Sequence, residues 1–314
     1  MNINLIGVPL YYGSDKKGAD LGPDKIRENS VMDIFHKYNH NAYDLGNIFV
    51  PKVSDEDKFL FHNKMKFLKP IVDVTTNLAE EVYNSLFSGK FPFIIGGDHS
   101  LGLGSISGAS KFYDNLAVIW VDAHGDINTD KTTESGNVHG MPLAAAMGIG
   151  SPELTNVYYS GRKVKPENVF IIGARDLDDG EYALISDRKL NVYSTKDIHD
   201  LGIEAILQDI HKKLTQNSVE AVHLSFDIDC IDKSLVPGTG TPVPNGMSID
   251  EGKYLIKYLM KTKLVKSMDL VEFNPLLDKD DKTLKVVMNL IDCTFKNLNN
   301  DVNNIFSNIA VEKA

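Results

Sequence analysis

The stretch LAVIWVDAHGD, residues 116–126, places two aspartates and a histidine directly after six consecutive apolar residues. A short, continuous apolar run is typical of a strand that is buried on both faces of a sheet, so the polar residues mark the carboxyl end of that strand. Runs of the same kind predict further strands at Ile3–Val8, Phe93–Ile95, Val169–Ile172, Val219–Phe226 and Leu264–Val271.

Longer amphipathic stretches lie between these runs and predict helices over about residues 23–38, 59–88, 196–214, 249–261 and 282–298. Pro70 is expected to break or kink the second helix, because proline lacks the N–H that a helix interior uses. Strands that alternate with helices indicate an α/β protein, three-layer α/β/α, with a central, mainly parallel sheet. No repeat or linker interrupts the pattern, so we expect a single domain over residues 1–314.

Composition excludes several classes of function. The net charge of −10 would repel phosphate backbones, so nucleic acid is not an expected partner. Cys230 and Cys293 are the only cysteines, too few for a disulfide scaffold and compatible with a reducing compartment. The N-terminus lacks a signal-peptide pattern and no run reaches membrane-spanning length, which predicts a cytoplasmic protein without membrane contact.

Metal-ligating and acidic residues follow four of the predicted strands. They are His99 after Phe93–Ile95, then Asp122, His124 and Asp126 after Leu116–Val121, Asp227 and Asp229 after Val219–Phe226, and Glu272 after Leu264–Val271. Ligands of parallel α/β sheets bind outside the carboxyl ends of the strands. Alternate side chains of an extended chain share a face, so Asp122, His124 and Asp126 are expected to point the same way, as are Asp227 and Asp229.

Together with His99, these residues predict a centre for two metal ions. Four carboxylates at one site repel one another and require protons or compensating cations. Nitrogen and oxygen ligands without thiolate favour Mn²⁺ or a similar hard to borderline ion. An isolated Asp-x-Asp is usually a turn or a helix cap, and only its combination with ligands from other strand ends indicates a two-metal hydrolytic site.

Other residues have structural interpretations. His223 shares a strand face with Asp227 but lies roughly 13 Å back into the sheet at ~3.3 Å per residue, which predicts a core histidine. Cys230 is expected to pack on the opposite face from the ligands. The glycines of residues 102–105 lack the lysine of a phosphate loop and indicate tight packing at a helix start, whereas residues 238–242 form a surface turn or a pocket wall.

An ordered series of motifs resembles the arginases of the ureohydrolase superfamily over nearly the whole chain. The series comprises IGVP (6–9), GGDHS (96–100), DAHGD (122–126), SGNVHGMP (135–142), GARD (173–176), SFDID (225–229), GTP (240–242) and VEFNP (271–275). The resemblance implies the arginase/deacetylase-like fold, one ureohydrolase catalytic domain, and hydrolysis of the guanidino group of L-arginine to L-ornithine and urea.

The resemblance also implies a role for each site residue. Two Mn²⁺ ions per subunit would be held by His99, Asp122, Asp126 and Asp227 and by Asp122, His124, Asp227 and Asp229, with Asp122 and Asp227 bridging. A hydroxide between the ions would attack the guanidinium carbon, Asp126 would relay its proton, and His139 would act as a mobile proton shuttle. Glu272 and Thr241 would contact the guanidinium, Asn128, Thr133, Ser135 and Asn137 the α-carboxylate, and Asp178 the α-amino group.

Two alternatives to an arginase stay open at this point. Agmatinases and other guanidino ureohydrolases share the metal motifs, and agmatine lacks the α-carboxylate, so residues at the amino-acid end of the substrate must discriminate. A chain that kept the fold but lost turnover would be a non-catalytic metal-binding regulator.

The resemblance implies a homotrimer or homohexamer, but this chain departs from the family pattern. Asp250 stands where many relatives carry an arginine that contributes to subunit contacts, and this reversal of charge argues against that assembly. Lys233 and Asn245 replace a usual proline and a usual glycine and are expected to shift the loop that bears Thr241.

Overall fold

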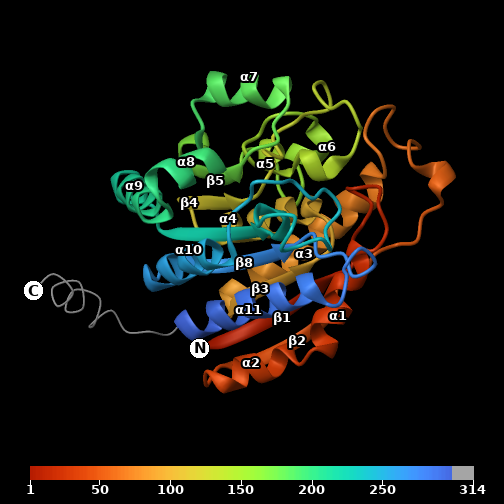
Figure 1. Ribbon diagram of the computed structural model, residues 1–314. Coiled ribbons are helices and arrows are strands. Elements are labelled where there is room, and N and C mark those ends of the chain that lie inside the picture. The colour runs from red at the N-terminus through yellow and green to blue at the C-terminus, as the bar shows by residue number, and fades with distance from the viewer. Residues whose placement is uncertain (299–314) are drawn as a thin grey trace, which may run out of the picture.

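The computed structural model of the chain describes residues 1–298. The prediction of one domain over residues 1–314 therefore includes a segment, 299–314, outside the described residues. The described residues form an eight-stranded sheet in the order β2-β1-β3-β8-β7-β4-β5-β6, with every pair parallel (Figure 1). This confirms the predicted α/β class and the central parallel sheet.

The strands and helices alternate along the chain. The strands are β1 (Asn2–Val8), β2 (Asn41–Asn47), β3 (Phe91–Gly96), β4 (Leu116–Val121), β5 (Val169–Ala174), β6 (Asn191–Ser194), β7 (Ala221–Asp227) and β8 (Val265–Val271). The helices are α1 (Gly22–Glu28), α2 (Val31–Lys37), α3 (Leu68–Phe87), α4 (Gly102–Phe112), α5 (Pro142–Ala146), α6 (Pro152–Thr155), α7 (Asp179–Arg188), α8 (Thr195–Leu201), α9 (Ile203–Gln216), α10 (Ile249–Lys261) and α11 (Lys282–Asn297).

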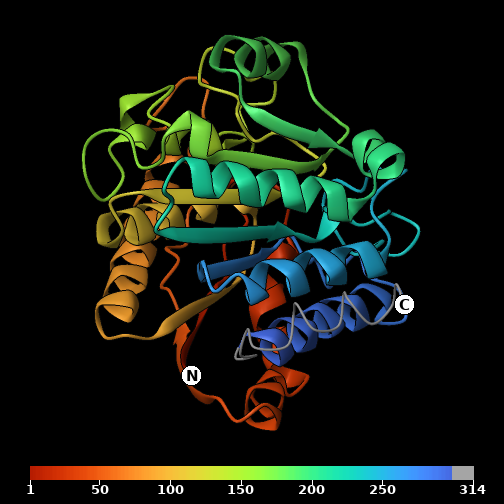
Figure 2. The same ribbon diagram turned by 90° about the vertical axis from the view of Figure 1, so that its left-hand side faces the viewer.

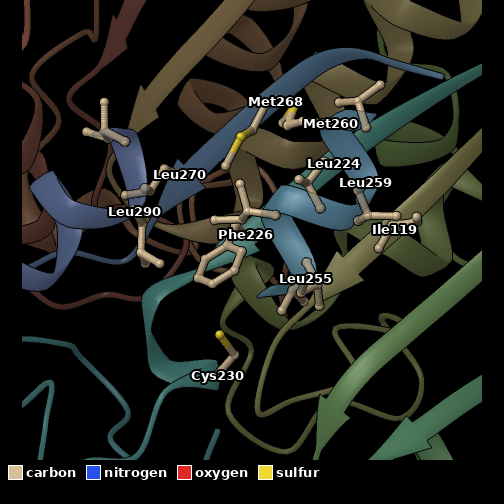
Figure 3. Close-up of a cluster of buried hydrophobic side chains, with 14 of the residues drawn as sticks. Ile119, Leu224, Phe226, Cys230, Leu255, Leu259, Met260, Met268, Leu270 and Leu290 are labelled. Atoms are coloured by element: carbon tan, nitrogen blue, oxygen red, sulfur yellow. The ribbon is translucent and has the colours of Figure 1, made fainter. Parts of the chain in front are cut away.

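Helices cover both faces of the sheet. Apolar residues of α3, α4 and α5 form one core with one face, and those of α2, α9, α10 and α11 form a second core with the other. Figure 2 shows α9, α10 and α11 side by side in front of the sheet, and Figure 3 shows the packing of α10 against the strands through Leu255, Leu259 and Phe226. Two covered faces explain why β3, β4 and β5 are apolar runs without a polar side.

Strand β4 illustrates how the sequence builds both cores. Val118 and Trp120 contribute to the core with α3 and α4, whereas Ile119 and Val121 contribute to the core with α10. Successive side chains of a strand point to opposite faces, so all of these residues are buried. None of the helices in residues 1–298 is long and apolar enough to cross a membrane.

Three predicted helices differ from the observed ones. The segment 23–38 forms two helices, because Ser30 adopts a left-handed conformation with φ of 62° between them. The segment 59–88 is helical only from Leu68, so Pro70 lies in the first turn, where its missing N–H breaks no helical hydrogen bond. The predicted break at Pro70 is therefore wrong. Gly202, with φ of 83°, divides the segment 196–214 into α8 and α9.

Candidate metal centre and substrate pocket

The four strands that precede the predicted ligands are neighbours in the middle of the sheet, in the order β3-β8-β7-β4. Val121 of β4 pairs with Phe226 of β7, and Asp227 of β7 pairs with Val271 of β8. The carboxyl ends of these strands are therefore level with one another, and the polar residues that follow them meet at one edge of the sheet.

Several of these side chains are oriented by turns of the backbone and not by an extended chain. Asp227 is the last residue of β7, and Asp229 lies in the short 3-10 helix Ile228–Cys230. Asp126 and Glu272 have positive φ angles of 52° and 64°. Asp126 and Asp229 therefore do not lie on the extended chain that the predicted alternation assumed. Left-handed backbone at residues other than glycine costs on the order of 1–3 kcal/mol and clusters at functional sites.

The first group of possible ligands surrounds the Nδ1 atom of His99. This atom lies 2.9 Å from Asp122 Oδ2, 3.2 Å from Asp227 Oδ2 and 3.3 Å from Asp126 Oδ2. All four residues are buried. Burial lowers the pKa of His99, but hydrogen bonds to the three carboxylates outweigh burial and hold this pKa well above its usual value.

The second group surrounds Nδ1 of His124, which lies 3.2 Å from Asp229 Oδ2 and 3.3 Å from Asp122 Oδ1. Asp122 therefore belongs to both groups and presents a different oxygen to each imidazole. Such sharing is what a carboxylate that bridges two ions requires.

The six side chains fit a pair of divalent cations. Four buried carboxylates within a few ångströms of one another are costly unless cations or protons compensate their charge. Burial and the charges of Asp229 and Asp122 raise the pKa of Asp227 well above its usual range, and burial with the charge of Asp122 raises that of Asp126 to about 6. Oxygen donors outnumber imidazoles in the cluster and no thiol belongs to it, which suits Mn²⁺ better than a thiophilic ion.

Hydrogen bonds hold the shared carboxylate in place. The backbone N–H of His124 donates to Asp122 Oδ1 at 2.7 Å, and the indole N–H of Trp120 donates to Asp122 Oδ2 at 3.0 Å. The backbone N–H of Asp229 likewise donates to Asp227 Oδ1 at 2.8 Å. Partners of this kind fix the direction of ligand oxygens before any ion binds.

Glu272 and His139 form an ion pair beside the metal ligands. Nδ1 of His139 lies 3.2 Å from Glu272 Oε1, which also accepts from the backbone N–H of His99 at 2.9 Å. Burial lowers the pKa of His139, but the carboxylate outweighs burial and raises it to about 9. Burial raises the pKa of Glu272, and the hydrogen bond from His139 reverses that effect, so the carboxylate is the favoured form.

A cavity of about 240 Å³ opens next to the ligand cluster. It is lined by His124, Asp126, Asn128, His139, Gly140, Asp176, Leu177, Asp178, Glu181, Asp227 and Thr241. Three residues assigned to the substrate by resemblance therefore face this cavity. Asn128 Nδ2 donates to Asp178 Oδ2 at 2.6 Å, and Thr241 Oγ1 donates to Asp229 Oδ2 at 3.1 Å.

The other residues assigned to the α-carboxylate do not line this cavity. Thr133 Oγ1 accepts from the backbone N–H of Gly136 at 3.0 Å, and Ser135 Oγ accepts from that of Asn137 at 3.1 Å. The Asn137 side chain is bonded to Lys66 and to the backbone carbonyl of Ser14. These contacts shape the loop that leads from Asn128 to His139.

Glu181 was not among the residues selected from the sequence, although it lines the cavity and is buried. It forms a capping box with Asp178 at the start of α7, and its Oε1 accepts from the backbone N–H of Ile127 at 3.3 Å. Burial and the charge of Asp126 raise its pKa to about 7. The spacing Asp178-x-x-Glu181 is the signal that could have indicated this residue.

Comparisons with known proteins agree with this geometry. The model of the Arginase family matches residues 1–296. Arginase of Staphylococcus aureus (strain COL) is 40% identical over 296 residues, which are 93% of this chain and 96% of that protein. The crystal structure of arginase from Bacillus subtilis subsp. subtilis str. 168 has a TM-score of 0.87 and 37% identity, and the match covers 96% of this chain and 99% of that one.

A third relative was solved with a bound amino acid. Arginase of Entamoeba histolytica in complex with L-ornithine has a TM-score of 0.85 and 32% identity, over 94% of this chain and 98% of that one. A family model that matches almost all of the described residues, together with these relatives, decides the family. The chain belongs to the arginase family of hydrolases.

Proposed function

We propose that the chain is a binuclear manganese hydrolase that converts L-arginine to L-ornithine and urea. The observation that carries this proposal is the convergence of His99 and His124 with Asp122, Asp227 and Asp229, with Asp122 shared and Asp126 in contact with His99, beside a polar cavity. The guanidinium carbon of arginine is stabilised by resonance and is a poor electrophile. Two bound Mn²⁺ ions would supply a strong nucleophile at neutral pH by lowering the pKa of water.

The residues of the chain would supply binding and proton transfer. Glu272 is buried, carries a carboxylate and lies beside the ligands, so it suits a charge-assisted bond to the guanidinium. Asp126 lies among the proposed ligands and lines the cavity, so it is placed to accept a proton from the attacking water. Asp126 would relay that proton to the leaving amine, and His139, which lines the cavity, would act as the proton shuttle.

The far end of the cavity would hold the amino-acid end of the substrate. Asp178 supplies negative charge for an α-ammonium group, and Asn128 supplies an amide N–H for an α-carboxylate. We assign Thr133, Ser135 and Asn137 to the rim that receives the carboxylate, and Thr241 to a second guanidinium contact. The bound L-ornithine in the related E. histolytica enzyme supports an amino acid as the ligand.

The test is urea release by the purified protein, supplied with arginine or with agmatine, after metal stripping and again after Mn²⁺ is added back. We expect Mn²⁺-dependent urea from arginine, and loss of at least about 100-fold in the Glu272→Gln variant, which keeps the shape of the side chain but removes its charge. Urea mainly from agmatine would show that the amino-acid end is misassigned. No urea from either substrate would support a non-catalytic metal-binding protein.

A further inference from the structure

A chain of buried polar side chains runs from His99 away from the cavity and into the sheet. Nε2 of His99 lies 2.8 Å from Ser225 Oγ, which lies 3.4 Å from Asp269 Oδ2. The same carboxylate oxygen lies 3.0 Å from Nε2 of His223, whose Nδ1 lies 2.8 Å from Ser267 Oγ. Each of these side chains is fully buried, and none of the proposed steps of catalysis uses Ser225, Asp269 or His223.

The sheet itself sets this geometry. Ser225 and His223 lie on β7, and their register partners on the neighbouring strand β8 are Asp269 and Ser267. Side chains of neighbouring strands that share a face are in contact, so the pairs Ser225–Asp269 and His223–Ser267 and the diagonal bond between His223 and Asp269 all follow from the register of β7 and β8. Ser105 of α4, which lies outside the sheet, adds one more hydrogen bond to this chain. Its Oγ donates to Asp269 Oδ2 at 2.6 Å.

The contact of His99 with Trp120 does not by itself fix which way round the imidazole ring lies. Its ring stacks on Trp120 with centroids 3.7 Å apart and an angle of 7° between the planes. A half-turn about the Cβ–Cγ bond would keep the ring in the same plane and keep the stacking. It would, however, exchange Nδ1 for a carbon atom at the position that faces the carboxylates. The bond to Ser225 exists only in the observed orientation.

The same bond selects the tautomer of His99. A hydroxyl has one hydrogen, and Ser225 donates it to Asp269. Ser225 therefore accepts from the Nε2–H of His99. A metal ion would displace the proton that Nδ1 shares with the three carboxylates, and the neutral imidazole would then present its lone pair on Nδ1. Asp269 makes this direction favourable, since its Oδ2 accepts from Ser105, Ser225 and His223.

A purely structural role explains this cluster less well. A buried carboxylate and imidazole cost free energy relative to apolar side chains of similar volume, even when they are paired. Asp269 Oδ1 has no hydrogen-bond partner among the described residues, so the pair is also incompletely satisfied. The free energy that burial of Asp269 and His223 costs is compensated if the two residues hold His99 in the orientation that metal binding requires.

We propose that Ser225, Asp269 and His223 are positioning residues that set the orientation and tautomer of His99, and thereby the affinity of the ion that His99 binds. This inference rests on the proposed two-metal function. It predicts a selective effect, because His124 holds the other ion and has no contact with Ser225, Asp269 or His223 among the hydrogen bonds of the described residues.

The test measures Mn²⁺ binding by the stripped full-length protein in titrations that resolve two dissociation constants, together with the Mn²⁺ electron paramagnetic resonance spectrum. In Ser225→Ala and Asp269→Asn, we expect one constant to rise about 10- to 100-fold and the other to change little. The spectrum of the magnetically coupled pair should then require correspondingly more Mn²⁺. Ser225→Thr, which keeps the hydroxyl, should restore tight binding.

Ser85→Ala is the matched control, because Ser85 is a buried serine of α3 that accepts from Asn4 of β1 at 2.9 Å and has no contact with the proposed ligands among the hydrogen bonds of the described residues. It should lower the melting temperature without changing either constant. Unchanged constants in both Ser225→Ala and Asp269→Asn would overturn the inference while leaving the two-metal function intact. A parent protein that binds no Mn²⁺ would overturn the proposed function as well. If Asp269→Asn does not fold, Ser225→Ala alone decides.

Discussion

Asp122 shows at the scale of one residue how the centre depends on local chemistry. Each of its oxygens faces a different imidazole, and each also accepts a fixed N–H, from His124 or from Trp120. Burial raises the pKa of Asp122, but hydrogen bonds from His124 and His99 outweigh burial and lower it strongly. Its neighbours Asp126 and Asp227 have raised pKa values, so protons and metal ions compete for these two carboxylates.

This competition predicts how metal binding depends on pH. The pKa of Asp126 is about 6 in the folded protein against 3.8 in a model peptide, so the folded, metal-free state holds this proton more tightly than the unfolded state. Its contribution to stability is complete below about pH 4 and is lost as the pH rises through 6. Metal ions bind the deprotonated ligands. The stabilisation by Mn²⁺ should therefore increase between pH 5 and pH 7.5.

The measurement compares melting temperatures of stripped and Mn²⁺-loaded protein across this pH range. We expect the difference between them to grow by at least about 5 °C. The Asp126→Asn variant is the control, since it removes the titrating group and should reduce the growth of the difference. A difference that is constant with pH in the parent protein would contradict the assignment of Asp126 to the metal centre.

Asp178 combines a structural role with a proposed substrate role, and one substitution can separate them. It caps α7 by accepting from the backbone N–H of Glu181 at 2.9 Å, and its other oxygen accepts from Asn128, with which it lines the cavity. Serine is also a favourable cap, so Asp178→Ser should keep the melting temperature within about 2 °C. Loss of the charge should raise the KM for arginine about 10- to 100-fold.

Steady-state kinetics on arginine check this prediction, with Asp178→Ala as the comparison that loses both the cap and the charge. If the KM of Asp178→Ser equals that of the parent while Asp178→Ala is impaired, the residue acts through the helix alone.

At the scale of elements, the sequence predicted those strands and helices whose pattern of apolar residues is clear. The buried strands β1, β3, β4, β5, β7 and β8 and the helices α10 and α11 were all predicted. The strands β2 and β6 were not, because they lie at the two edges of the sheet and contain no fully buried residue. Their alternation is too weak to separate them from loops. The break at Ser30 was missed because a left-handed serine leaves no signal in the pattern of apolar residues.

The ends of three segments meet at Arg175, whose five N–H groups all bind backbone carbonyls. They donate to Gly173 near the end of β5, to Asp229 and Cys230 after β7, and to Val243 and Pro244 of the loop that follows Thr241, at 2.7–3.3 Å. The guanidinium therefore joins the proposed metal ligand Asp229 to the loop that bears Thr241. Asn245, in place of the usual glycine, keeps the left-handed φ of 59° that this loop needs.

Arg175→Lys keeps the charge but loses the planar fork, so fewer of these bonds can form. We expect amide hydrogen exchange in peptides covering residues 239–248 to become about 10-fold faster. Arg27→Lys is the matched control, because Arg27 joins α1 to β2 through Asp44 and Asn47 at the sheet edge. It should accelerate exchange near β2 only. Unchanged exchange at residues 239–248 in Arg175→Lys would show that the loop is held by other contacts.

The order of the strands and the lining of the cavity depend on the fold of the whole molecule and could not be predicted from any single segment. Each ligand motif was visible in the sequence, but the order of the strands was not, and this order brings β3, β8, β7 and β4 together. The cavity depends on tertiary structure in the same way. Glu181 enters it from α7, which follows β5, a strand whose end carries none of the metal ligands. Residue types and spacing therefore indicated the metal centre, whereas the cavity and its lining required the fold.

Assembly is the remaining property at this scale, and we propose that Asp250 weakens it. Asp250 is exposed in the first turn of α10, where a carboxylate is favourable for the helix itself because it faces the positive end of the helix dipole. At a contact between copies that uses an arginine in related enzymes, the same charge would leave acidic partner groups without a cation.

Light scattering at several concentrations should find the parent smaller than a trimer at about 1 μM and Asp250→Arg shifted toward the trimer, since removal of a like-charge contact favours association. Glu251→Arg is not a suitable control because Glu251 belongs to the capping box with Ser248, so Lys253→Asp one turn away serves instead. A trimer that Asp250→Arg leaves unchanged would show that this position lies outside the interface.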